Sequence, residues 1–239
     1  MSALSIAHLY PEQLNIYADR GNMMVLAERC RRRGIGFELV GCGPGDPLPR
    51  ADLYYLGGGQ DRDQALVADD LRRRAGDLRI AAEAGAIVLG VCGGYQMLGH
   101  RYLGHHGDEI PGIGLVDLET VAGGTRMIGN VSIECDLDGS RLTVAGFENH
   151  AGRTTLGDGL RPLGRVLHGN GNNGRDGGEG VLAGSVIGTY IHGPLLPKNP
   201  ALADWLIRRA LEPRDGVVEL APLDDRLADE ARRVALTLE

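Results

Sequence analysis

The residues best suited to chemistry surround Cys92. The stretch 87–99, IVLGVCGGYQMLG, is an apolar run that reaches a Gly-Val-Cys-Gly-Gly corner and continues with helical spacing. A buried strand, a tight turn and a helix make a nucleophile elbow, which holds its side chain above the carboxyl edge of a sheet. Gly90, Gly93 and Gly94 suit this corner because a Cβ atom there would collide with neighbouring backbone. The helix dipole favours a thiolate, so we expect Cys92 to be a nucleophile for acyl transfer rather than a structural cysteine.

A second strand exit can supply donors that stabilise an acyl-transfer oxyanion. We expect the Gly93 N–H to form one half of the oxyanion hole and the stretch 55–61, YLGGGQD, to form the other. Either Gly58 or Gly59 can be the donor, and the sequence leaves this choice open. The alternative interpretation of the stretch is a plain flexible turn. A P-loop would have Gly-Lys-Ser/Thr after the glycines, but Gln60 and Asp61 follow them here, and we expect this chain to bind no nucleotide.

Acyl transfer from a thiolate also needs a general acid that protonates the leaving group. The chain has seven histidines. His192, in the stretch GTYIHGP, ends a predicted strand and precedes a proline-rich turn. Open α/β sheets place catalytic groups at such strand ends, so His192 is the first candidate. His150 is the second, and it could instead orient a loop by hydrogen bonding.

Alternating strands and helices are expected to position these groups. In the first half, the strand patterns cover 3–11, 36–43, 51–56 and 86–91, and the helical patterns cover 21–34, 62–84 and 95–103. This alternation predicts an α/β fold, with a mostly parallel central sheet flanked by helices.

The second half changes character. Short strand-like runs over 112–121, 128–137, 143–152, 160–168, 180–186 and 186–193 predict additional antiparallel strands. The glycine-rich stretch 169–180 is interpreted as a flexible hairpin tip or lid, with a plain loop as the alternative. A helix over 199–211 is expected to begin with Asn199 as its N-cap and Pro200 at its first position. We expect one domain over 1–211, with 212–239 as a tail or peripheral helix of that domain.

Composition excludes several functional classes. The chain has 239 residues, 43% of them hydrophobic, and a net charge of −7 without a basic block, which disfavours nucleic acid or an anionic membrane as partner. No stretch approaches the ~20 apolar residues of a spanning helix, so we expect no membrane insertion and a cytoplasmic location. The other cysteines, Cys30, Cys42 and Cys135, are widely spaced. We expect them to be small buried hydrophobes rather than zinc ligands or disulfide partners.

Together the motifs resemble a known family. LGVCGGYQMLG, YLGGGQD and the late GTYIHGPLLPKNP resemble class I glutamine amidotransferases, in particular the cobyric-acid-synthase-like branch. LNIYADRGNM, GFENHAGRT and YIHGPLLPKNP resemble the GatD-type glutaminase subunits of lipid II isoglutaminyl synthases. The resemblance runs from about residue 4 to about residue 211.

The resemblance implies a mechanism. The Cys92 thiolate would attack the side-chain amide of L-glutamine, His192 would protonate the departing ammonia, and water would hydrolyse the thioester. The family also implies an arginine that binds the substrate carboxylate, and this role falls on Arg126 in GGTRMIGN. One departure concerns the His-x-Glu pattern of many relatives, because Gly193 and Pro194 follow His192 here. We expect a partner protein to supply the carboxylate that orients the imidazole, with a water or a backbone carbonyl as the alternatives.

The same resemblance implies a partner. A Mur-ligase-like synthetase of the MurT type would form a heterodimer with this chain. It would use ATP and Mg to activate the α-carboxyl of D-glutamate in lipid II, and ammonia would then give D-isoglutamine. No cofactor is expected in this chain. The alternatives are the glutaminase component of a cobyrinic or cobyric acid amidase, and a non-catalytic scaffold subunit, against which the intact Cys92 and His192 argue.

Overall fold

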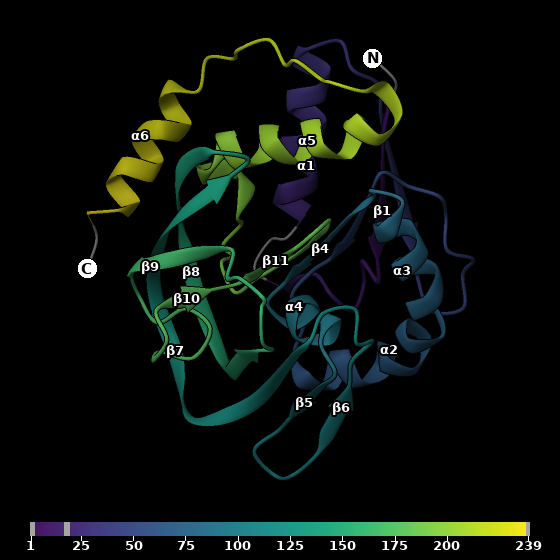
Figure 1. Cartoon of the computed structure of the whole chain (residues 1–239), viewed down its shortest axis with the longest axis vertical. Coiled ribbons are helices and arrows are strands. Elements are labelled where there is room, and N and C mark those ends of the chain that lie inside the picture. The colour runs from purple at the N-terminus through teal and green to yellow at the C-terminus, as the bar shows by residue number, and fades with distance from the viewer. Residues whose placement is uncertain (1–2, 17–19, 238–239) are drawn as a thin grey trace.

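Six strands form the central sheet of the computed structural model, which describes residues 3–16 and 20–237 (Figure 1). Their order is β11-β12-β4-β3-β1-β2. The bounds are β1 (Leu4–Leu9), β2 (Phe37–Cys42), β3 (Leu53–Leu56), β4 (Ile87–Val91), β11 (Val181–Ala183) and β12 (Val186–Thr189). Five of these strands pair in parallel and β11 pairs antiparallel to β12. The mostly parallel sheet predicted from the sequence is confirmed.

Burial on both faces explains why the central strands are apolar. Every residue of β3, LYYL, and of β4, IVLGV, is buried. A parallel sheet covered by helices on both sides reads as such continuous apolar runs. β2 lies at the edge of the sheet, and its residues 38–41 are exposed.

Helices cover the two faces of this sheet. α1 (Arg20–Arg32) packs against α5 (Pro200–Asp215), which contacts β1 and β4. α2 (Asp61–Arg73), α3 (Ala75–Glu83) and α4 (Gly93–Leu98) lie on the other face, where α4 contacts β3 and β4. From β1 the chain adds β2 on one side and then β3 and β4 on the other. Right-handed crossovers in these two opposite directions place α1 and α2 on opposite faces of the sheet.

Two helix predictions are wrong in their extent. The single helix expected over 62–84 is two helices that meet at Arg74. The Arg74 guanidinium is buried and donates to the Cys42 sulfur over 2.6 Å and to the Gly43 carbonyl over 2.7 Å. The junction coincides with these tertiary contacts, and Gly76 follows as the second residue of α3. The helix expected over 95–103 instead starts at Gly93 and stops at Leu98, and 101–103 form a strand.

A second sheet carries the antiparallel strands. Its order is β10-β9-β7-β5-β6, with β8 paired to β7. The bounds are β5 (Arg101–Leu103), β6 (Glu109–Pro111), β7 (Leu118–Leu137), β8 (Ser140–Leu156), β9 (Gly164–His168) and β10 (Gly178–Glu179). The long β7–β8 hairpin runs along one side of the molecule (Figure 1). Its turn residue Asp138 accepts a hydrogen bond from the Trp205 indole over 2.7 Å, which fastens the hairpin to α5.

The glycine-rich stretch 169–180 is the connection of the β9–β10 hairpin, which confirms the hairpin interpretation. Residues 174–177 are exposed, but Asn172 and Glu179 are buried. The Asn172 side chain accepts a hydrogen bond from the Tyr95 hydroxyl over 3.1 Å, which packs the stretch against α4. Its GNGNNG sequence has the spacing of a dinucleotide loop, but it joins antiparallel strands and opens no helix.

The C-terminal segment extends the helical layer. α5 begins after Asn199 as predicted, but the Asn199 side chain bonds the backbone of Ala145 and Leu195 and does not cap the helix. α5 continues to Asp215, past the helix end expected at 211. The short 3₁₀ helix η2 (Leu196–Lys198) precedes α5. The last helix of the described residues, α6 (Arg226–Ala235), lies at the periphery (Figure 1).

Candidate active site

Cys92 occupies the corner between β4 and α4. Its backbone has φ +52° and ψ −108°, in a region that side-chain-bearing residues rarely adopt. Its N–H donates to the Thr189 carbonyl over 2.8 Å, and its carbonyl accepts from the Gln96 N–H over 3.1 Å. These two bonds hold the strained turn in the strand–turn–helix geometry that the sequence predicts.

Close backbone packing explains the glycines at this corner. A Cβ atom on Gly93 would lie 2.9 Å from the Gly59 nitrogen and from Gln64 Nε2. A Cβ atom on Gly94 would lie still closer to the carbonyl oxygen of Leu56. Real Cβ atoms do not approach other atoms so closely, so both positions require glycine.

The glycine triplet lies against the same corner. The Gly57 carbonyl accepts from the Gly94 N–H over 3.0 Å, and the Gly58 carbonyl accepts from the Ile16 N–H over 3.1 Å. Gly59 lines the cavity beside Cys92, whereas Gly58 is not among the lining residues. The strand exits predicted to form an oxyanion hole are therefore side by side, with Gly59 and Gly93 in contact distance.

His192 follows β12, the strand next to β4. It is 1% exposed, and its backbone exchanges two hydrogen bonds of 3.0 Å with Phe147 of β8. These bonds join the two sheets next to the elbow. The carboxyl ends of β3, β4 and β12 thus bring the triplet, Cys92 and His192 to one edge of the central sheet.

The surroundings of His192 favour its neutral form. Burial lowers the pKa of His192 to about 4, and the charges of His150 and Arg126 act in the same direction. At pH 7 the imidazole is therefore a base that can take a proton.

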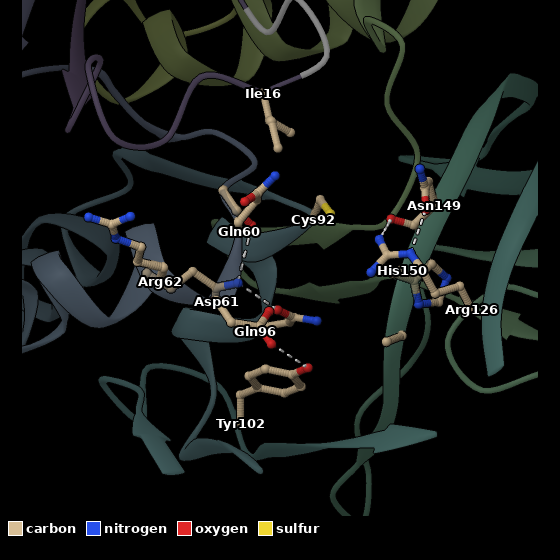
Figure 2. A pocket seen from close by; sticks show the side chains of 13 residues that line it. Ile16, Gln60, Asp61, Arg62, Cys92, Gln96, Tyr102, Arg126, Asn149 and His150 are labelled. Atoms are coloured by element: carbon tan, nitrogen blue, oxygen red, sulfur yellow. Dashed lines mark hydrogen bonds between the residues drawn. The ribbon is translucent and has the colours of Figure 1, made fainter. Parts of the chain in front are cut away.

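A cavity of about 440 Å³ opens at the elbow. Figure 2 shows the Cys92 sulfur between two walls, with Gln60 and Asp61 on one side and Asn149 and His150 on the other. Cys92 is 8% exposed, so its side chain is accessible from this cavity. His192 is not among the residues that line the cavity; it lies at the β8 wall through its pairing with Phe147. A volume of this size suits a small ligand.

Arg126 lies in the β8-side wall. It comes from the irregular part of β7, and it donates to Asn149 through Nε to Oδ1 and through Nη2 to the carbonyl oxygen, both over 2.9 Å. Both residues line the cavity with Cys92. The guanidinium is exposed and can still bind an anionic ligand.

Among the lining residues that sequence reasoning did not predict are Asp61, Gln64, Gln96 and Tyr102. Gln96 Oε1 accepts from Gln64 Nε2 over 3.1 Å, and its Nε2 donates to the Tyr190 hydroxyl over 3.2 Å. Asp61 accepts from the Tyr102 hydroxyl over 3.2 Å. Gln96 lies one helical turn after Cys92, and this i+4 spacing is the feature that could have found it.

The remaining cysteines have no such setting. Cys30, Cys42 and Cys135 are buried and free, as expected. Burial raises the pKa of Cys30 to about 11 and that of Cys135 to about 12, which keeps both as thiols. Among the described residues, no group of three His, Cys, Asp or Glu side chains could hold a metal ion.

Comparison with known proteins now decides the family. Residues 5–200 match the CobB/CobQ-like glutamine amidotransferase domain. The chain belongs to this amidotransferase family. The match covers most of the chain and confirms the resemblance and the glutamine-hydrolysing enzyme class inferred from the motifs. Residues 17–19 of the LNIYADRGNM motif lie outside the described residues.

Curated relatives show which members of the family this amidotransferase is similar to. It is 37% identical over 238 residues to the lipid II isoglutaminyl synthase subunit GatD of Staphylococcus aureus, covering 99% of this chain and 96% of the relative. It is 38% identical to GatD of Streptococcus pneumoniae, covering 95% and 88%. Cobyric acid synthase of Sphingopyxis alaskensis is 37% identical over 216 residues, but the chain spans only 41% of that relative.

Solved structures confirm the fold of the amidotransferase. The PurLQS structure from Thermotoga maritima matches with a TM-score of 0.58 at 20% identity, covering 89% of this chain and 99% of that chain. A crystal structure of a glutamine amidotransferase matches with a TM-score of 0.53 at 16% identity, covering 85% and 98%. No helix in the described part of the amidotransferase has the length and apolarity needed to cross a membrane.

Proposed function

We propose that this chain is the glutaminase subunit of a lipid II isoglutaminyl synthase and acts in peptidoglycan synthesis in the cytoplasm. The observation that carries the proposal is the similarity to two GatD subunits over 96% and 88% of their lengths. A cavity that exposes Cys92 at a nucleophile elbow supports catalysis over a scaffold role. Cobyric acid synthase, by contrast, is matched over less than half of its length.

In this proposal, His192 takes the proton of the Cys92 thiol, and Sγ forms a bond to the side-chain carbonyl carbon of glutamine. N–H groups of Gly93 and Gly59 stabilise the resulting oxyanion. The imidazolium then gives its proton to the amide nitrogen while the C–N bond breaks, which releases ammonia. Water attacks the thioester carbon, glutamate leaves, and the thiol is restored. Arg126 binds the α-carboxylate of the substrate throughout.

Ammonia is the product that a synthetase partner would use. We place ATP, Mg and the lipid substrate on a MurT-type ligase subunit that forms a heterodimer with this chain. Because Gly193 and Pro194 replace the acidic position of a His-x-Glu pattern, we also place on the partner a carboxylate that orients His192. A dyad without that group retains part of its rate, so the isolated subunit should hydrolyse glutamine slowly and the complex faster.

The test is co-purification with an ATP-dependent Mur-ligase-like protein, followed by incubation with lipid II, ATP, Mg and glutamine labelled with ¹⁵N at its amide. The expected result is lipid II that gains one labelled amide by mass spectrometry. A Cys92→Ala complex should lose transfer from glutamine but retain amidation from added ammonium. Transfer from glutamine that survives Cys92→Ala would leave only the scaffold role. Labelled product from a cobyrinic acid acceptor, with none from lipid II, would favour the cobalamin alternative.

A further inference from the structure

Each of the three glycine carbonyls before α2 accepts a hydrogen bond, and these bonds fix the direction of the peptide groups beside Cys92. We propose that the oxyanion hole is already formed in the isolated chain, because the Ile16 N–H and the Gln64 side chain hold the glycine triplet with the Gly59 N–H facing the elbow. Ile16 and Gln64 act here as positioning residues. The inference rests on the proposed function in one respect, the need to stabilise an oxyanion at Cys92.

The first carbonyl of the triplet rules out the Gly58 N–H as the oxyanion donor. The Gly57 carbonyl accepts from the Gly94 N–H over 3.0 Å, so this carbonyl points toward the start of α4. The described residues contain no cis peptide bond, and in a trans peptide the N–H points opposite to the carbonyl of the same group. The Gly58 N–H therefore points away from the elbow.

The second carbonyl turns the next peptide group over. The Gly58 carbonyl accepts from the Ile16 N–H over 3.1 Å, so the Gly59 N–H points away from the Ile16 backbone. The Gly59 nitrogen lies 2.9 Å from the position that a Cβ atom on Gly93 would occupy, so it adjoins the residue after Cys92. In the described part of the chain, no group accepts a hydrogen bond from the Gly59 N–H, which leaves this donor available to a ligand.

The third carbonyl is fixed by the side chain of Gln64 in α2. Gln64 Nε2 donates to the Gly59 carbonyl over 3.3 Å and to Gln96 Oε1 over 3.1 Å. A backbone carbonyl only accepts, so the contact with Gly59 decides which end of the Gln64 amide is the nitrogen. Gln64 is 1% exposed, and Gln96 is itself bonded to the Tyr190 hydroxyl. Two side-chain amides thus tie the triplet to the elbow helix.

The segment that carries Ile16 is packed against the triplet. The N–H groups of Gln13 and Leu14 both donate to the Tyr10 carbonyl, over 3.1 Å and 2.8 Å, which forms a turn after β1. Leu14 is fully buried, and a Cβ atom on Gly59 would lie only 2.5 Å from its side chain. Figure 2 shows the Ile16 side chain at the cavity that exposes the Cys92 sulfur. This turn therefore keeps the Ile16 N–H in place.

The arrangement has a consequence for catalysis. The three carbonyls of the triplet are held by three different elements, which are α4, the segment before α1, and α2. Donors that are fixed before the reaction stabilise a developing charge without reorganisation. A ligase partner that raises the glutaminase rate should therefore act on His192 rather than on the oxyanion hole.

The first test uses Gln64→Met in the full chain, which keeps the length of the side chain but removes the donor to the Gly59 carbonyl. We expect glutaminase kcat to fall roughly 10- to 100-fold with little change in KM, because a misplaced donor stabilises the transition state less. Alkylation of Cys92 by iodoacetamide forms no tetrahedral oxyanion, so its rate should stay near that of the wild type. The control is Leu66→Gln, at an exposed position of the same helix.

Two outcomes of this test would overturn the role of Gln64. Equal losses in turnover and in alkylation rate would show that the variant distorts the elbow as a whole. Unchanged turnover would show that the Gly59 peptide does not depend on the Gln64 amide.

A second comparison tests the backbone donor. Ile16→Pro removes the N–H that bonds the Gly58 carbonyl, whereas Ile16→Val keeps this N–H and a branched side chain. We expect kcat of the proline variant to lie roughly 10-fold or more below that of the valine variant, with thermal unfolding curves to show that both fold. Equal kcat values in the two variants would overturn the role of Ile16.

A third measurement needs no variant. The wild-type chain is labelled with ¹⁵N-glycine and treated with 6-diazo-5-oxo-L-norleucine, whose diazo carbon takes a proton before the Cys92 sulfur displaces N₂ and leaves a bound ketone. The amide resonances of Gly59 and Gly93 should then shift more than that of Gly58. A larger shift at Gly58 would overturn the proposal. If the chain and its complex release no ammonia from glutamine, the proposed function falls, while these spectra still report which N–H faces the sulfur.

Discussion

The backbone N–H of Cys92 donates to the carbonyl oxygen of Thr189 over 2.8 Å. This bond continues the parallel pairing of Val91 with Thr189 beyond the end of β4. His192 comes three residues later, so the register of two neighbouring strands sets how far the imidazole lies from the elbow. A change in that register would separate Cys92 from His192, the two residues proposed as nucleophile and base.

The contact between Gly93 and Gly59 leads to a first prediction. Gly93→Ala would place a Cβ atom 2.9 Å from the Gly59 nitrogen and would push apart the two N–H groups that we propose as oxyanion donors. We expect glutaminase kcat to fall roughly 100-fold, the usual cost of losing one such donor. Release of ammonia measures it. Gly124→Ala is the matched control, because a Cβ atom there meets nothing within 4 Å; an equal loss in both variants would contradict the role of Gly93.

Arg126 should control the affinity for substrate. Arg126→Gln removes the charge that we propose pairs with the α-carboxylate, and a charged hydrogen bond is worth ~1.5–3 kcal/mol. We expect KM for glutamine to rise roughly 10- to 100-fold with a smaller change in kcat. Arg165→Gln, on an exposed pair with Glu134 of the same sheet, serves as the control. A fall confined to kcat would argue against a binding role for Arg126.

Asp61 should recognise the α-ammonium group of glutamine. It is the one carboxylate among the described lining residues, and it faces the cavity wall opposite Arg126 (Figure 2). Asp61→Asn should raise KM for glutamine but leave KM for 4-carbamoylbutanoate, which lacks the amino group, nearly unchanged. Asp63→Asn changes the same first turn of α2 outside the cavity and should affect neither substrate. Equal losses on both substrates would show that Asp61 only supports the helix.

Glu179 should make stability depend on pH. It is fully buried, and burial raises its pKa from the ordinary 4.5 to about 8. Between these values the folded protein keeps a proton that the unfolded chain releases, so the free energy of unfolding should fall as pH rises from about 4.5 to about 8. Glu179→Gln should flatten this fall in thermal unfolding curves, whereas the exposed Glu134→Gln should not. A wild-type Tm decline that Glu179→Gln fully retains would contradict the assignment.

The sequence around Cys92 was sufficient to predict the elbow, because adjacent residues there specify a strand, a tight turn and a helix. It also placed His192 at a strand end, because neighbouring parallel strands end at one edge. The helix break at Arg74 was not predicted; the Arg74 guanidinium there contacts Cys42, 32 residues away, and local pattern does not specify such a contact. The same limit applies to the buried Glu148 carboxylate, which accepts hydrogen bonds from the N–H groups of Asn170 and Gly171, because these residues meet β8 only in the folded second sheet.

The left-handed backbone of Cys92 also carries a cost that falls on the protein as a whole. A side-chain-bearing residue in such a conformation loses about 1–3 kcal/mol of stability. Glycine would adopt φ +52° without that loss, so Cys92→Gly should unfold at a higher temperature while releasing no ammonia. Activity and stability are opposed at this residue. The proposed nucleophile thus occupies a corner where glycine would give the more stable backbone.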